Sequence, residues 1–317
     1  MNITPVYDAN YDCYDGIIAT ICAANNRDFF MIFASKLFFR CISTNSHSVE
    51  GCFSLYSYDY ATQILEKVHG IQIVGRVFFS KEELFREIEN EIKNKTPLSL
   101  KINTYQCPWS ELYCKKHIEH EILVVGIDIE ADTLICLDPY LTKERQRLRL
   151  PTEQQMFECK KYRLIDDHIS PMGCLKILKR NLQICRELLR ENFTNLKKVM
   201  QNINGDDVSV EQMNNYLLAM RLNTFQNNRI CFLRMLDTLN LRYGFCFAYE
   251  IKLINEEIND VGKLRTVIVK SIIKKTIQDK MSKIIDMIEG IYEEEKEIIE
   301  SLLVRVDNYI VGILNKK

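Results

Sequence analysis

The sequence predicts an α+β fold followed by an all-α region, and three observations lead to this prediction. Short, apolar strand-like runs alternate with amphipathic helical patterns up to about residue 170. Beyond Pro171 and Gly173 the sequence contains no further proline. The apolar spacing there becomes that of long helices. We therefore predict two domains, residues 1–172 and residues 173–317.

The first domain is expected to combine three helices with a group of strands. Apolar residues at helical spacing predict helices over 12–24, 58–68 and 81–93. Runs rich in isoleucine, valine and leucine predict strands over 71–79, 98–103, 120–127, 133–137 and 146–150. Turn-like residues separate the later strands by short intervals, which favours an antiparallel sheet with the helices gathered near the N-terminus.

The second domain is expected to be a bundle of long helices. Apolar residues at helical spacing extend over residues 176–203, 209–257 and 263–314. Each stretch is long enough to bury one face against its neighbours, so we predict a helical bundle in this half.

Composition excludes several classes of function. The 42 basic and 43 acidic residues give a net charge of −1, so no strong field is available to hold nucleic acid or a membrane surface. No apolar run reaches the length of about 18 residues that a membrane span requires. The twelve cysteines form no CxxC pair, and the N-terminus lacks the layout of a signal peptide. We expect a cytoplasmic protein with reduced thiols, no metal site and no bound cofactor.

Three residues stand in an order that suggests nucleophilic catalysis. Cys13 lies at a predicted helix start, His120 opens a strand and Asp138 follows the next strand. A helix N-terminus lowers the pKa of a thiol, and an imidazole that a carboxylate orients can take its proton. His117 competes with His120 for the role of base, but it lies in a lysine-rich loop and is expected to be solvated.

Whole segments resemble a known family. YDCYDGIIATICAANNRDF, PLSLKINTYQCPWSELYCKKHIEHEILVVGID and ADTLICLDPY together resemble the butirosin biosynthesis protein H family, closthioamide-type amide synthetases among them, over roughly residues 5–170. The resemblance implies a papain-like cysteine fold, in which the helix that bears the nucleophile packs on an antiparallel sheet. Bacteriocin-processing cysteine peptidases are more distantly similar, through Asp12-Cys13, His120 and Asp138-Pro139.

The resemblance also implies an activity. Members of that family take an acyl group from a carrier-protein thioester and pass it to an amine, which implies an acyl-Cys13 intermediate and a Cys13, His120, Asp138 triad. The phosphopantetheine arm of an acyl or peptidyl carrier protein would then be part of the donor. Acceptors within the family include an aminosugar amine and a small diamine, in antibiotic and other natural-product biosynthesis.

The sequence departs from the peptidases at one position. The glutamine that supplies an oxyanion donor six residues before their cysteine corresponds here to Tyr7. A phenol donates one hydrogen bond and the nearby Asn10 offers an amide, so both are candidates to complete an oxyanion hole with the Cys13 backbone N–H. A thioester needs less polarisation than a peptide, so this departure favours acyl transfer.

Further residues are candidates for substrate binding. Asp12 and Asp15 flank the nucleophile and are expected either to cap the helix or to bind a cationic amine. Three aromatic residues are candidates for an acyl tunnel or, alternatively, for core packing: Tyr105, Trp109 and Tyr113.

One strongly basic run is a candidate docking surface for the carrier protein. Lys263 to Lys283 contains seven basic residues and one acid, and Lys263, Lys270 and Lys274 lie near one helix face. A solvated helix face is the alternative interpretation.

Two other functions remain open from the sequence. The same triad with water as acceptor would make a thioesterase or a cysteine peptidase. A non-catalytic module that binds a carrier protein is the third possibility.

Overall fold

The computed structural model describes residues 1–41, 53–54, 58–151, 156–201 and 208–315. Two compact units make up the chain, Met1–Phe29 with Thr62–His168, and Phe30–Ala61 with Ile169–Lys317. This division differs from the predicted boundary at residue 172, because residues 30–61 are grouped with the helical half. The division into two independent domains at residue 172 stays a prediction.

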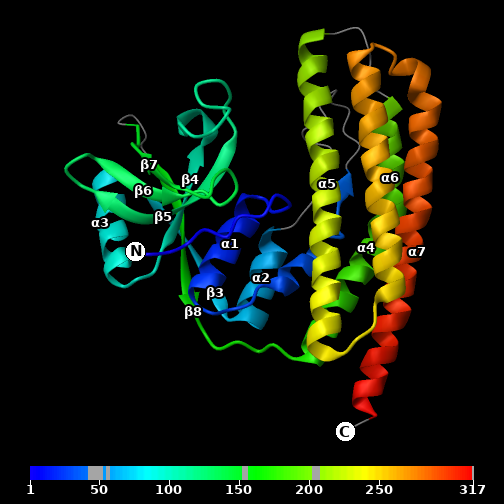
Figure 1. The fold of residues 1–317 in the computed structure, drawn as a ribbon, viewed down its shortest axis with the longest axis horizontal. Helices are drawn as coiled ribbons and strands as arrows, with labels where there is room; N and C mark the ends of the chain where they lie inside the picture. The colour runs from blue at the N-terminus through cyan, green and yellow to red at the C-terminus, as the bar shows by residue number, and fades with distance from the viewer. Residues whose placement is uncertain (42–52, 55–57, 152–155, 202–207, 316–317) are drawn as a thin grey trace. The chain divides into compact units, whose positions relative to one another are not determined.

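A six-stranded antiparallel sheet forms the centre of the first unit (Figure 1). Its strand order is β3-β8-β4-β5-β6-β7. The strands are β3 (Ile71–Phe78), β4 (Leu98–Asn103), β5 (Glu119–Asp128), β6 (Thr133–Leu137), β7 (Arg145–Leu148) and β8 (Phe157–Leu164). The predicted α+β class with an antiparallel sheet is confirmed. Strand β8 was not predicted, because its sequence FECKKYRL contains too few apolar residues to stand out.

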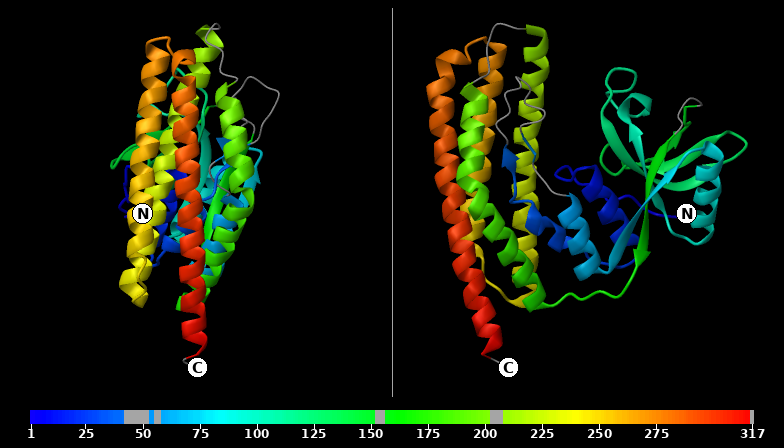
Figure 2. Two further views of the ribbon diagram at one scale, coloured as in Figure 1. Left: turned by 90° about the vertical axis from the view of Figure 1, so that its right-hand side faces the viewer. Right: turned by 180° about the vertical axis from the view of Figure 1, so that it is seen from behind.

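Helices cover both faces of this sheet. Figures 1 and 2 show α1 (Cys13–Ala24) and α3 (Lys81–Lys93) on opposite sides of β5, while α2 (Tyr58–His69) precedes β3. Ile122 and Val124 of β5 belong to the apolar core that includes Leu84 and Ile88 of α3. Since side chains alternate along a strand, Glu121 and its alternate neighbours face α1 instead.

The start of α1 is fixed by a reciprocal cap. A side-chain oxygen of Asp12 accepts a hydrogen bond from the Asp15 backbone N–H at 2.8 Å, and Asp15 accepts one from the Asp12 N–H at 3.2 Å. Such a capping box satisfies two backbone donors that a helix start leaves unpaired. It makes Cys13 the first residue of α1.

The described residues of the second unit include four long helices, which confirms the predicted all-α region. They are α4 (Pro171–Gln201), α5 (Val208–Tyr243), α6 (Ala248–Ile273) and α7 (Met281–Leu314). The apolar patterns over residues 209–257 and 263–314 each contain a helix end, because Gly244 and Lys275 take positive φ values of 68° and 55° and end α5 and α6. Across the described residues, no helix is long and apolar enough to cross a membrane.

A buried charged group lies inside this helical unit. Arg229 is fully buried and forms ion pairs with Glu257 at 3.2 Å and Glu295 at 2.5 Å. Burial raises the pKa of Glu295 to about 8, with the neighbouring Glu257 adding to the rise and Arg229 opposing it. Removal of Arg229 alone would leave two carboxylates uncompensated in the core.

Residues 30–61 are bound into the helical unit by an apolar segment and by side-chain amides. The 3-10 helix η1 (Phe30–Ser35) is buried throughout, and β1 (Arg40–Cys41) pairs with β2 (Phe53–Ser54). Asn192 of α4 donates to the Phe39 carbonyl at 2.6 Å and accepts from the Cys41 N–H at 3.0 Å. These bonds join chain segments about 150 residues apart.

Candidate active site

A buried histidine and aspartate form the polar centre of the first unit. His120 Nε2 lies 2.8 Å from Asp138 Oδ2, and their side chains are 4% and 0% exposed. His120 is the second residue of β5 and Asp138 directly follows β6, the strand paired with β5. Adjacent strand ends thus bring together two residues that are 18 positions apart.

Three donors hold the Asp138 carboxylate in place. Besides His120, Oδ2 accepts a hydrogen bond from Trp109 Nε1 at 2.7 Å, and Oδ1 accepts one from the Leu141 N–H at 3.2 Å. Because His120 uses Nε2 toward the carboxylate, Nδ1 is the ring nitrogen available for proton transfer. A fixed carboxylate sets the tautomer and orientation of the imidazole that it contacts.

The first turn of α1 lies against Glu121 and Pro139, the residues that follow His120 and Asp138 in the chain. The backbone N–H of Glu121, which follows His120, faces the Cys13 thiol. A Cβ atom added to Gly16 would lie 3.2 Å from the Pro139 side chain, so α1 passes close to the residue after Asp138. Among the described residues, no hydrogen bond joins Cys13 to His120, and by strand alternation His120 lies on the side of β5 that carries Ile122 and Val124, whereas Glu121 faces α1. The structure therefore brings His120 and Asp138 together but does not join Cys13 to them. Catalytic hydrogen bonds are often loose in the absence of substrate.

The environment of Cys13 favours the neutral thiol. Burial raises its pKa most, and the carboxylates of Asp12, Glu121 and Asp15 raise it further, while the Glu121 N–H lowers it. The sequence-based expectation of a lowered pKa is wrong for this state, because desolvation and three negative charges outweigh the helix N-terminus. For this thiol to act as a nucleophile, a base would therefore have to take its proton.

Glu121 is a residue of the site that the sequence analysis missed. Its carboxylate accepts a hydrogen bond from Ser99 Oγ and forms an ion pair with Lys160 at 2.6 Å. Ser99 in turn lies 2.8 Å from Tyr162 Oη. The sequence contained one signal for Glu121. It is a charged residue on a strand face whose next members, Leu123 and Val125, are apolar.

Replacement of Glu121 by glutamine tests the electrostatic contribution of this carboxylate. Since the Glu121 anion raises the pKa of Cys13, its removal lowers that pKa and increases the thiolate fraction at any pH below it. Lys160 then also lacks its counter-charge, which acts in the same direction. We expect alkylation of Cys13 by iodoacetamide, followed by mass spectrometry, to become several-fold faster at neutral pH.

Glu119→Gln is the matched control, because Glu119 lies two residues earlier on the same strand and is exposed, with its carboxylate paired to Lys101 at 2.7 Å. Its alkylation profile should equal that of the wild type. Identical profiles in the Glu121 and Glu119 variants would show that the carboxylate of Glu121 does not govern the thiol.

The remaining candidates near the N-terminus have other contacts. Asp12 and Asp15 form the helix cap described above, which is the structural alternative expected from the sequence. Asn10 donates its side-chain amide to Asp8 at 3.0 Å. Tyr7 is 41% exposed, with Lys143 Nζ 5.1 Å from its ring centre. The oxyanion roles of Tyr7 and Asn10 stay predictions.

The aromatic candidates separate into two groups. Trp109 is half-buried and bonds to Asp138, so it contacts the polar centre directly. Tyr105 and Tyr113 are exposed, and the Tyr105 ring stacks on His117 with centroids 4.3 Å apart. His117 and His120 were both candidates for the base, and the structure places His120, not His117, in contact with Asp138.

The close approach of Gly16 to Pro139 predicts a positioning effect. A valine at position 16 would push α1 away from the Asp138-Pro139 turn, and a displacement of about 1 Å can cost roughly a hundredfold in rate. We expect Gly16→Val to lower kcat/KM by about tenfold or more while the protein stays folded. Steady-state kinetics and a melting curve measure the two effects separately.

Gly75→Val on β3 is the matched control, because a Cβ atom there meets no other atom within 4 Å. It should retain wild-type kinetics. A Gly16 variant with unchanged kinetics would mean that the packing of α1 on Pro139 is unimportant for the site.

Comparison with known proteins adds one finding. Residues 38–167 match the family described as the Peptidase_C39 like family. The match includes His120 and Asp138 but begins after Cys13. It supports the coarse prediction of a cysteine-dependent, papain-like enzyme. None of the curated proteins matches the chain.

The described residues contain neither a disulfide nor a cluster of metal-binding side chains. None of the eleven cysteines in this part of the chain is in a disulfide, and Cys52 lies outside it. The same residues contain no group of three or more histidine, cysteine, aspartate or glutamate side chains placed to hold a metal ion.

Proposed function

We propose that the protein is an amide-forming acyltransferase. Cys13 takes an acyl or peptidyl group from a carrier-protein thioester and passes it to a small amine, a diamine or an aminosugar, in natural-product biosynthesis. His120 is the base and Asp138 orients it. No bound cofactor is required, since the phosphopantetheine arm belongs to the donor substrate.

The observation that supports this proposal is the anionic environment of the Cys13 thiol. A half-buried thiol close to several carboxylates is a weak nucleophile, so it reacts more readily with an activated acyl donor such as a thioester than with a peptide. The same carboxylates attract a protonated amine to the site. Both consequences fit acyl transfer to a cationic acceptor.

The chemistry proceeds in two steps. In the first, Cys13 Sγ bonds to the thioester carbonyl carbon, and the carbon–sulfur bond to the phosphopantetheine arm breaks. His120 Nδ1 takes the Cys13 proton and returns it to the departing thiol. In the second, the amine gives its ammonium proton to solvent, the neutral amine attacks the acyl-Cys13, the carbon–sulfur bond breaks, and the remaining amine proton passes through His120 to Cys13. The Cys13 backbone N–H, with Tyr7 or Asn10, would stabilise the oxyanion in both steps.

An acyl thioester of N-acetylcysteamine with 1,3-diaminopropane tests the proposal. We expect mass spectrometry to show the mono-amide as the main product, and an acyl adduct on Cys13 when the amine is omitted. Formation of free acid alone, at the same rate with and without the diamine, would contradict acyl transfer. An absence of both the adduct and any product would favour the non-catalytic alternative.

A hydrolase is the second candidate, because the family match is to proteins that resemble peptidases. The same residues would then direct water onto the acyl-Cys13. A thioesterase would release acid from the thioester assay, and a peptidase would also cleave an unactivated peptide. Each result differs from the expected amide.

Carrier docking gives a separate prediction. Lys263, Lys270 and Lys274 are exposed on α6 or at its C-terminal end, although Lys263 pairs with Asp260. If the face with Lys270 and Lys274 steers an acidic carrier protein, the double change to glutamate should raise KM for the carrier-bound donor several-fold. Turnover of the small thioester should be unchanged, and the effect should shrink as added salt screens the charges.

Arg186→Glu with Lys198→Glu is the matched control, because both side chains are exposed basic residues on α4. It should leave KM within about twofold of wild type, since it reverses equal charge away from the proposed face. Equal effects of the two double variants would indicate a response to net charge, and no effect of either would contradict docking at α6.

A further inference from the structure

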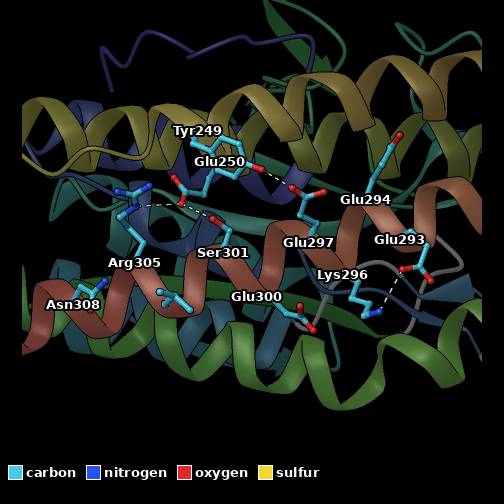
Figure 3. Close-up of a pocket in the computed structure, with 11 residues that line it drawn as sticks. Tyr249, Glu250, Glu293, Glu294, Lys296, Glu297, Glu300, Ser301, Arg305 and Asn308 are labelled. Carbon is cyan, nitrogen blue, oxygen red and sulfur yellow. Dashed lines mark hydrogen bonds and ion pairs between the residues drawn. The ribbon is translucent and has the colours of Figure 1, made fainter.

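We infer that a groove between α6 and α7 binds a linear polyamine. The groove has a volume of about 770 Å³ and lies within the second unit (Figure 3). Its described lining is Tyr249, Glu250, Glu293, Glu294, Lys296, Glu297, Glu300, Ser301, Val304, Arg305 and Asn308. The inference does not depend on the proposed acyl transfer.

The charge of this lining is strongly negative. Five glutamates face two basic residues, Lys296 and Arg305, and burial raises the pKa of one of the five, Glu294, to about 7. Lys296 already bonds to Glu293 at 3.3 Å, so it does not neutralise the rest of the groove. An excess of carboxylates around a concave surface favours a cationic ligand.

Glu250 provides a second, independent indication of a cation site. Its side chain is fully buried although it lines the groove. Oε1 accepts hydrogen bonds from Ser301 Oγ at 2.7 Å and Arg305 Nε at 3.3 Å, as Figure 3 shows. Oε2 has no hydrogen-bond partner among the residues that the structure describes. A buried carboxylate oxygen without a donor is unfavourable, and an ammonium group would supply one.

The spacing of the acidic residues favours a long cation over a metal ion. From Ser301, beside Glu250, to Glu293 the chain rises about 12 Å along α7 at 1.5 Å per residue. A metal ion needs its oxygens in one shell at about 2.0–2.6 Å, and the described residues contain no such cluster. Ammonium groups separated by methylene segments can instead reach both ends of the groove.

Two side chains suit the aliphatic part of such a ligand. Val304 and Tyr249 both line the groove and are exposed, at 63% and 47%. Methylene groups can lie on Val304, and an ammonium group can lie over the face of the Tyr249 ring. The Tyr249 hydroxyl donates to Glu297 at 2.5 Å, which keeps the ring beside the carboxylates.

Isothermal titration of the full chain with spermidine at low salt tests the inference. We expect one site, a clear loss of affinity with added sodium chloride, and no binding of the uncharged 1,8-octanediol. Glu250→Gln should weaken spermidine binding about tenfold, because glutamine keeps the contacts of Oε1 but removes the charge.

Glu297→Gln with Glu300→Gln provides a second variant that does not disturb the core, since both residues are exposed. It should also weaken binding about tenfold. Glu187→Gln with Glu191→Gln, two exposed acids of α4, removes the same charge elsewhere and should leave the affinity within about twofold. Melting curves establish that each variant is folded.

Three results would overturn the inference. One is equal affinity in the wild type, the groove variants and the α4 control. Another is an equal loss in the groove and control variants, which would indicate general attraction to a negative surface. The third is displacement of spermidine by magnesium chloride at equal charge concentration. If Glu250→Gln fails to fold, the Glu297 and Glu300 variant alone decides the outcome.

Discussion

Replacement of Cys13 by alanine is expected to abolish acyl transfer and acyl-adduct formation, with the fold intact. Without the sulfur no covalent intermediate forms, and the loss in kcat should be roughly 10⁴-fold or more. Cys13→Ser should be nearly as damaging, because a buried hydroxyl near carboxylates is harder to deprotonate than the thiol. Product formation from the small thioester, measured by mass spectrometry, gives both rates.

Cys246→Ser is the control for this change, since Cys246 is an exposed free thiol of the helical unit. It should retain wild-type turnover. An alanine variant at position 13 that forms product within a few-fold of the wild-type rate would exclude Cys13 as the nucleophile.

Replacement of His120 by alanine should be as damaging as loss of the thiol. His120 is the group that the structure holds on Asp138, so under the proposed mechanism its removal eliminates the base for both steps. Asp138→Asn should cost the same or less, because it keeps the position of the side chain but changes the tautomer that it favours. Single-turnover rates of adduct formation and of amide release test each step.

The double variant of Cys13 and His120 should lose little more activity than either single variant, since residues that act as one unit are not additive. His117→Ala is the histidine control. The exposed His117 stacks on Tyr105, so its loss should be mild. Severe loss at His117 together with a tolerant His120 would reverse the assignment.

The sequence predicted the strands that bring His120 and Asp138 together, because both residues border short apolar runs with clear turn signals. The sequence did not predict that the surroundings of Cys13 raise the pKa of its thiol. A helix start lowers a thiol pKa only if the thiol is solvated and the nearby charges are few. Burial of Cys13 and the approach of Glu121 depend on packing between segments more than 100 residues apart.

Two other features could not be predicted for similar reasons. Trp109 is a candidate for a tunnel wall or for core packing from the sequence, and its hydrogen bond from the indole N–H to Asp138 depends on tertiary contact. The helix ends at Gly244 and Lys275 depend on single residues of positive φ inside continuous apolar patterns. Periodicity alone does not detect such interruptions.

The attachment of residues 30–61 to the helical unit affects how the protein is made. On the ribosome, the apolar segment Phe30–Ser35 emerges about 150 residues before Asn192, whose amide bonds Phe39 and Cys41. At typical synthesis rates of about 5–20 residues per second, that interval is roughly 8–30 s. During it, the nascent chain exposes Phe30, Ile32 and Phe33, which are buried in the finished protein. Expression of this protein should therefore respond to chaperone supply and translation rate, and a chain cut at residue 172 would leave these side chains permanently uncovered.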